Sequence, residues 1–172
     1  APMTIRGFWA LFQAHLIAYG RSRTAIYWSL AFPLFFLFIF QFAFARGDAR
    51  VASSLMPGLF TITIISGSFF GVALRMVTER ENGILRRHRV APVSALDVVL
   101  AHGATALLTL LTSLAVQLLV ASLVFHIHIA GSPLALGVVL AMGGLALIPV
   151  GLIVGSVARD SRTAPAITNF LF

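Results

Sequence analysis

Apolar residues fill four long stretches of the chain, and every charged residue lies between or outside them. The stretches are residues 25–45, 55–74, 100–125 and 134–157. Each has at least the roughly 20 residues that a helix needs to cross a bilayer, where a central charge would cost about 3 kcal/mol. Residues 98–158 are uncharged but too long for one crossing, and Gly131, Ser132 and Pro133 predict the turn that divides them. The pattern therefore predicts an all-α, polytopic integral membrane helical bundle with four full spans.

Two further segments flank these spans. Residues 163–172 are apolar, and we expect them to begin a fifth span that continues beyond the chain. In residues 4–20 the apolar side chains recur at helical spacing, while Arg6 and Gln13 lie on another face. This spacing predicts an interfacial helix along the membrane surface. A signal peptide is the alternative, but Gln13 and His15 interrupt the apolar run that such a peptide requires.

Composition agrees with a membrane protein. The chain is 59% hydrophobic and 10% charged, whereas a soluble domain is about 25% charged. The net charge is +7, but the positive residues sit in short loops between spans, so we expect a lipid bilayer and no nucleic acid as partner. Hydrolase and intramembrane protease motifs are absent, so no catalytic residue is expected.

The arginines predict the orientation. Ten of the twelve lie before the first span or after the second and fourth, and only Arg46 and Arg50 lie on the opposite side. Loops rich in Arg remain on the cytoplasmic side, so the N-terminus should be cytoplasmic. The exclusive use of Arg as the basic residue indicates a bacterium with a GC-rich genome, and hence the bacterial cytoplasmic (inner) membrane as the location.

The most charged segment, residues 75–97, follows the second span. Asn82 and Gly83 predict the end of the preceding helix, and residues 84–90 predict a short basic helix. Ser94 to Asp97 has the spacing of a capping box that opens the third span. An ordinary Arg-rich loop is one interpretation. However, Glu79 and Glu81 have no part in setting orientation, and they favour a docking surface.

Residues 79–87 read Glu-Arg-Glu-Asn-Gly-Ile-Leu-Arg-Arg, and Ala91-Pro92-Val93-Ser94 follows. This pattern resembles the signature loop of the type-2 ABC transporter permeases, the membrane subunits of ABC exporters. The order of interfacial helix, spans and loops is similar as well. Members of that family usually have six spans, so by this resemblance the chain lacks the end of the fifth span and all of the sixth.

The resemblance implies that the loop is a coupling helix seated in a groove of a partner ABC ATPase. The residues assigned to this coupling loop are Glu79, Arg80, Glu81, Asn82, Gly83, Ile84, Leu85, Arg86, Arg87 and Arg89. ATP and Mg would bind the partner, because a P-loop needs a Lys and this chain has none. The implied assembly is a homodimer of permeases with two ATPase subunits. It would export an amphipathic small molecule such as a drug, a lipid or a natural product, as in multidrug efflux.

Small and hydroxylated residues within the spans give further candidates. A polar substrate path could be lined by Thr61, Thr63, Ser66 and Ser68. Such hydroxyls also commonly bond to carbonyls of their own helix. Close helix packing is predicted at Gly67, Gly71, Gly144, Gly151 and Gly155. That packing could lie within the chain or form the seam of a homodimer.

The spans contain no Asp, Glu or Arg. Ion-coupled transport usually needs such groups, so their absence disfavours the main alternative, an ion-coupled carrier or channel subunit without an ATPase partner. A membrane scaffold or enzyme subunit would leave the Glu-Arg-Glu loop unexplained. His126 and His128 are close in sequence but lack a third ligand, so no metal site is expected. His15 and His102 are expected at the membrane interface.

The orientation can be tested by labelling single cysteines, since the chain has none of its own. We expect a cysteine at position 48 to react with an impermeant reagent from outside, and one at position 86 or 162 to react only from the cytoplasm. The N-terminus and position 128 serve as further inside and outside markers. Labelling of position 48 from the cytoplasmic side alone would overturn this topology.

Overall fold

The computed structural model describes residues 5–45, 48–81, 83, 94–127 and 132–158. These residues form helices and no strand, which confirms the predicted all-α fold. The α-helices are α1 (Ile5–Arg21), α2 (Arg23–Ile26), α3 (Phe32–Phe40), α4 (Ala49–Ile64), α5 (Gly71–Glu81), α7 (Ala95–Val124) and α8 (Pro133–Val157). Three π-helical stretches continue them: η1 (Tyr27–Ala31), η2 (Gln41–Ala45) and η3 (Ile65–Phe70).

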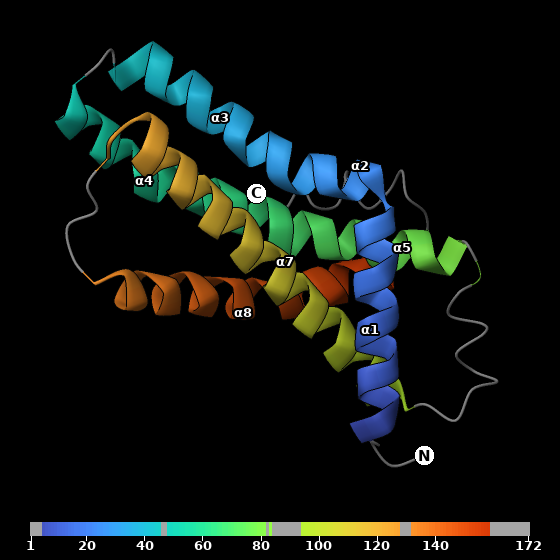
Figure 1. Cartoon of the computed structure of the whole chain (residues 1–172). Helices are drawn as coiled ribbons and strands as arrows, with labels where there is room; N and C mark the ends of the chain where they lie inside the picture. Colours follow the sequence, from blue (N-terminus) through green and yellow to red (C-terminus); the bar gives the residue numbers. More distant parts are fainter. Residues whose placement is uncertain (1–4, 46–47, 82, 84–93, 128–131, 159–172) are drawn as a thin grey trace.

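Four continuous helical units are long and apolar enough to cross a membrane: Arg23–Ala45, Arg50–Glu81, Leu96–Val124 and Leu134–Val157. They run along the bundle, whereas α1 lies across one end of it (Figure 1). The start of α4, the end of α7 and the start of α8 lie at the opposite end (Figure 1). We call the end with α1, the last turn of α5 and the first turn of α7 the loop end, because the predicted coupling loop joins α5 to α7.

Polar side chains begin three of the helices. The Ser22 hydroxyl accepts a hydrogen bond from the Ala25 amide at 3.2 Å, where the chain turns from α1 into α2. The Asp48 carboxylate accepts one from the Arg50 amide at 2.8 Å and starts α4. Ser94 and Asp97 each accept a hydrogen bond from the other's amide, so the capping box predicted at the start of α7 is confirmed.

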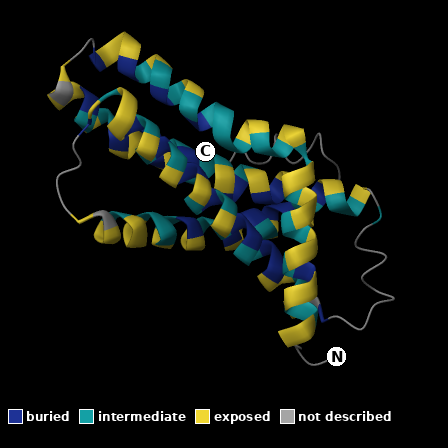
Figure 2. Cartoon of the chain, viewed as in Figure 1, coloured by how far each residue is buried: buried dark blue, intermediate teal, exposed yellow. Residues whose placement is uncertain are grey.

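The largest core lies between α3, α4 and α7. Its buried side chains include Leu37, Leu59, Phe60, Leu110 and Leu114. The outward faces of the helices are exposed (Figure 2), and they carry large apolar residues such as Phe42 and Leu134. A soluble protein of this size would bury such faces, whereas a bilayer solvates them.

Proline interrupts the backbone hydrogen bonds of the first span, and a neighbouring helix repairs the gap. Pro33 has no amide hydrogen, so the carbonyl of Ser29 loses its usual helical partner. The Ser113 hydroxyl of α7 donates to that carbonyl at 2.7 Å. Within the hydrocarbon no water could do so, and this bond therefore fixes the first span against α7.

Glycines bring α8 close to the second span. A Cβ atom at Gly151 would lie 2.7 Å from the Ser68 carbonyl oxygen and 2.8 Å from that of Phe69. One at Gly155 would lie 3.0 Å from the Ala73 carbonyl oxygen, and one at Gly144 would lie 2.4 Å from a methyl of Leu110. These three predicted packing glycines therefore make their close contacts within the chain.

The other two predicted packing glycines, Gly67 and Gly71, have more space around them. Gly67 faces a Leu110 methyl, which a Cβ atom would approach to 3.3 Å. Gly71 is exposed, and a Cβ atom there would meet only the Ser66 carbonyl of its own helical unit. Among the described residues no other helix packs closely on Gly71, and its part in a dimer seam stays a prediction.

Replacing Gly151 by Leu should destabilise the fold, because the new side chain would meet backbone atoms that cannot rotate away. We expect a loss of about 3 kcal/mol, at the upper end for overpacking. Gly137→Leu on the same helix is the matched control, since a Cβ atom at that exposed position meets nothing within 4 Å. Unfolding in detergent micelles measures both, and equal stability of the two variants would contradict this packing.

Candidate functional site

The loop end contains a polar contact between α5 and α7. Oε2 of Glu79 lies 2.7 Å from Nε2 of His102, and the His102 side chain is almost fully buried. The other ring nitrogen, Nδ1, lies 2.9 Å from the Val98 carbonyl oxygen. A carbonyl can only accept, so Nδ1 carries a hydrogen and donates it. The buried ring is thus fixed in orientation, with Nε2 directed at the carboxylate.

Helix α1 packs on the same contact. The ring of His15 meets the ring of His102 edge to face, with centroids 4.3 Å apart. One turn further along α1, Tyr19 packs under the Arg75 guanidinium, which lies 5.7 Å from the ring centroid, and its hydroxyl bonds to Ser29. Three helices from distant parts of the sequence therefore meet at one polar junction. We call His15, Glu79 and His102 the loop-end cluster.

Arg80, the next residue of the predicted coupling loop, joins α5 to α8. Its Nη1 atom donates to the Ser156 carbonyl oxygen at 3.2 Å, and Nη2 donates to the carbonyl oxygen of Ala158. These carbonyls lie in the last turn and at the C-cap of α8, where backbone carbonyls have no partner within the helix. A cation at this position also complements the negative end of the helix.

The coupling loop leaves α5 just beyond these contacts. Glu81 is exposed, and Gly83 has a φ angle of 71°, a left-handed conformation that suits glycine and ends the helix as predicted. Asn82, Ile84, Leu85, Arg86, Arg87 and Arg89 lie outside the described residues. Their assignment to ATPase coupling stays a prediction.

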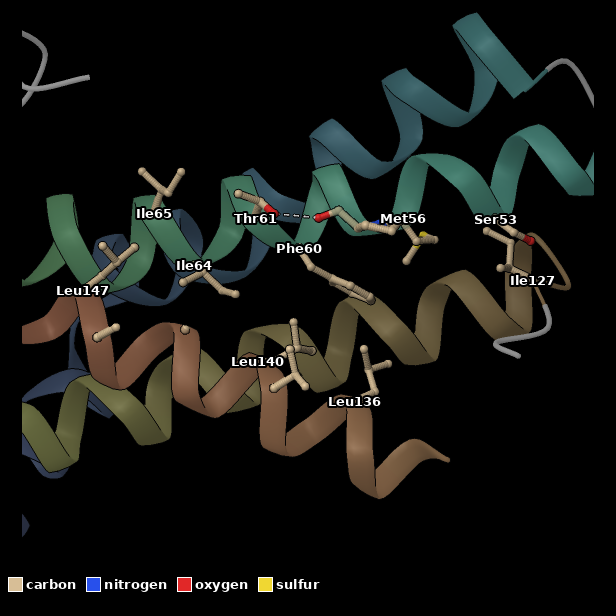
Figure 3. Close-up of a pocket in the computed structure, with 14 residues that line it drawn as sticks. Ser53, Met56, Phe60, Thr61, Ile64, Ile65, Ile127, Leu136, Leu140 and Leu147 are labelled. Atoms are coloured by element: carbon tan, nitrogen blue, oxygen red, sulfur yellow. Dashed lines mark hydrogen bonds between the residues drawn. The ribbon is translucent and has the colours of Figure 1, made fainter. Parts of the chain in front are cut away.

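A cavity of about 850 Å³ lies between α4 and α8. Its walls are mostly aliphatic, and Phe60, Leu136 and Leu140 point into the space between the two helices (Figure 3). Ser53 and Thr61 are the hydroxylated residues in the wall. Such a surface suits an apolar or amphipathic molecule and offers few groups to a strongly polar one.

The four hydroxyls predicted to line a path point to different places. Thr61 lies in the cavity wall and donates to the Pro57 carbonyl at 2.9 Å (Figure 3). Thr63 is buried and donates to Oε1 of Gln117 on α7 at 2.9 Å. Ser66 bonds to carbonyls of its own helical unit, and Ser68 is buried where α8 approaches. Of the four, Thr61 alone borders this cavity.

The sequence analysis did not predict the contacts of several polar residues, among them His15, His102 and Gln117. His15 and His102 were expected only to lie at the interface, and Gln117 was not considered. Each of them interrupts an apolar segment, and a polar side chain there needs a partner, because burying it alone costs free energy. A polar residue within an apolar segment is therefore the signal in the sequence that could have found these contacts. It indicates that a contact exists but does not identify the partner.

Comparison with known protein families supports the resemblance of the loop. Residues 6–172 match the family described as ABC-2 type transporter, and the chain belongs to that family. It is thus the membrane-spanning transport subunit of an ABC transporter, and the family implies an ABC ATPase as its partner. Comparisons with curated proteins and with solved structures each found no match. Family membership favours the ABC transporter over the ion-coupled alternative.

Removal of the Arg80 side chain tests the link between α5 and α8. We expect Arg80→Leu to lower the free energy of unfolding by about 1.5 kcal/mol, because two carbonyls lose a charged donor. Arg23→Leu, at an exposed position of α2, is the control and should change stability little. The two variants are compared by unfolding of the purified chain in detergent. A loss no larger for Arg80→Leu than for Arg23→Leu would contradict the link.

Proposed function

We propose that this chain is the permease subunit of an ATP-driven exporter in which the coupling loop receives the force of the ATPase. The observation that supports the proposal is that the three residues of the Glu-Arg-Glu motif have different surroundings. Glu79 contacts His102, Arg80 contacts the last turn of α8, and Glu81 is exposed at the start of the loop. A displacement of the loop therefore reaches α7 and α8 through the first two residues, while the third faces outward.

The interfacial helix belongs to the same mechanical unit. His15 and Tyr19 of α1 rest on His102 and Arg75. Closure of two ATPase subunits around ATP would move α1, α5 and the start of α7 together, which favours a switch between inward-facing and outward-facing states. ATP and Mg would bind the partner, since a chain without Lys cannot build a P-loop.

The substrate we propose is an amphipathic small molecule such as a drug, lipid or natural product. The cavity between α4 and α8 supports this class, because its wall is aliphatic with the hydroxylated Ser53 and Thr61. We place a second copy of the permease opposite this wall, as a homodimer. The orientation proposed is an N-terminus in the cytoplasm of a bacterium and spans in its inner membrane, which the Arg distribution supports.

The coupling loop is tested by substitution at its apolar anchor. Leu85→Asp should abolish association with the ATPase, because a desolvated aliphatic side chain carries more binding energy than the charges at a rim. Glu81→Lys should weaken association or uncouple ATP hydrolysis from transport. Both variants should insert normally, since neither residue lies in an expected span.

Co-purification of the ATPase with each variant, followed by transport in membrane vesicles, measures the effect. Leu85→Met retains an apolar side chain of similar size and is the matched control. It should keep both the ATPase and transport. Normal association and full transport by Leu85→Asp would reduce the loop to an orientation signal, and the proposal would fail.

A further inference from the structure

We propose that the loop-end cluster is a binding site for a divalent transition-metal ion of the Zn²⁺ type. His15, Glu79 and His102 come from α1, α5 and α7, and each offers one ligand atom. These three atoms lie within 4.8 Å of one another. Two imidazoles and one carboxylate form a donor set that Zn²⁺ uses, with a water in the fourth position. This inference does not depend on the direction of transport or on the substrate.

The hydrogen bonding of His102 is the first argument. Because Nδ1 donates to the Val98 carbonyl, Nε2 of the neutral ring has a lone pair directed at the Glu79 carboxylate 2.7 Å away. Two acceptors facing each other in a buried site repel. A positive centre must therefore lie between them, either a second ring proton or a metal ion.

The hydrogen bond from Nδ1 of His102 to the Val98 carbonyl is also typical of a metal-binding histidine. Histidines that coordinate a metal through one nitrogen commonly donate the other N–H to a backbone carbonyl, which fixes the tautomer and the direction of the lone pair. His102 has this arrangement, with Nε2 directed at the Glu79 carboxylate and the His15 ligand atom within 4.8 Å. Burial of the ring also limits competition by water.

His15 favours a metal ion over a proton. A proton shared by His102 and Glu79 involves two side chains, whereas the structure places a third side chain, the imidazole of His15, against the His102 ring. Zn²⁺ ligand bonds of about 2.0–2.2 Å separate neighbouring tetrahedral ligands by roughly 3.3 Å. Glu79 would move away from His102 by a fraction of an ångström to admit the ion. The Glu79 side chain can do so more easily than that of His102, because it is the less buried of the two.

Such an ion would cross-link α1 to both helices that flank the coupling loop. It would fix the position of α1 and stiffen the path from the loop into the bundle. Nitrogen ligands select Zn²⁺ over Mg²⁺, which prefers oxygen ligands and would remain with ATP on the partner.

The test is Zn²⁺ binding by the complete chain in lipid nanodiscs, purified without a histidine tag and stripped of metal with a chelator. Titration calorimetry and elemental analysis should give one Zn²⁺ per chain, and Mg²⁺ should not compete. His15→Gln and Glu79→Gln should each weaken Zn²⁺ binding at least tenfold. His126→Gln, which removes an imidazole at the far end of α7, is the matched control and should bind as the wild type does.

Thermal unfolding provides a second readout that is independent of transport. Zn²⁺ should raise the melting temperature of the wild type and of His126→Gln, and should leave that of His15→Gln unchanged. His15 is only partly buried, so this variant should fold even if Glu79→Gln does not. Absence of saturable Zn²⁺ binding, or binding to His15→Gln as tight as to the wild type, would overturn the proposal and leave a proton between His102 and Glu79.

Discussion

Hydrocarbon offers no hydrogen bond to a polar group, and this constraint accounts for the polar contacts of the bundle. Polar atoms inside a span therefore depend on the protein itself for hydrogen-bond partners. The freed carbonyl of Ser29 is met by Ser113, and the amide of Gln41 donates to the Ala52 carbonyl at 3.1 Å. Thr63 and Gln117 meet between the second span and α7. Because lipid competes with apolar packing but not with these bonds, they set which helix faces are joined.

The same constraint separates the two ends of the molecule from its middle. Charged groups gather at the loop end, where Glu79, Arg75 and Arg80 contact α7, α1 and the end of α8 in turn. Between the ends, close approach depends on glycine, as where α8 meets the carbonyls of Ser68 and Phe69. Charged contacts therefore position the helix ends, whereas glycine packing and uncharged hydrogen bonds position the middle of the helices.

Periodicity and charge predicted the helical bundle, the turn after Glu81 and the capping box at Ser94, because each depends on residues close in sequence. The partners of His102 could not be predicted in this way. His15 and Glu79 reach it from two other helices, and their meeting depends on how α1 crosses the bundle. The hydroxyls show the same limit. Thr61 and Thr63 are two residues apart on one helix, yet one borders the cavity and the other faces α7.

The π-helical stretch η3 divides the second span into two parts with different neighbours. On the loop-end side of η3, α5 is joined to α8 by Arg80 and by the close contact at Gly155, while Gly151 of α8 meets η3 itself. On the other side of η3, α4 packs with α3 and α7 in the main core and forms a wall of the cavity. π-Helical stretches are rare, and where they interrupt an α-helix they commonly lie at functional positions. If force enters at the predicted coupling loop, it would move α5 and α8 together, because Arg80 and Gly155 join them. It would then reach the cavity both through α8 and across η3.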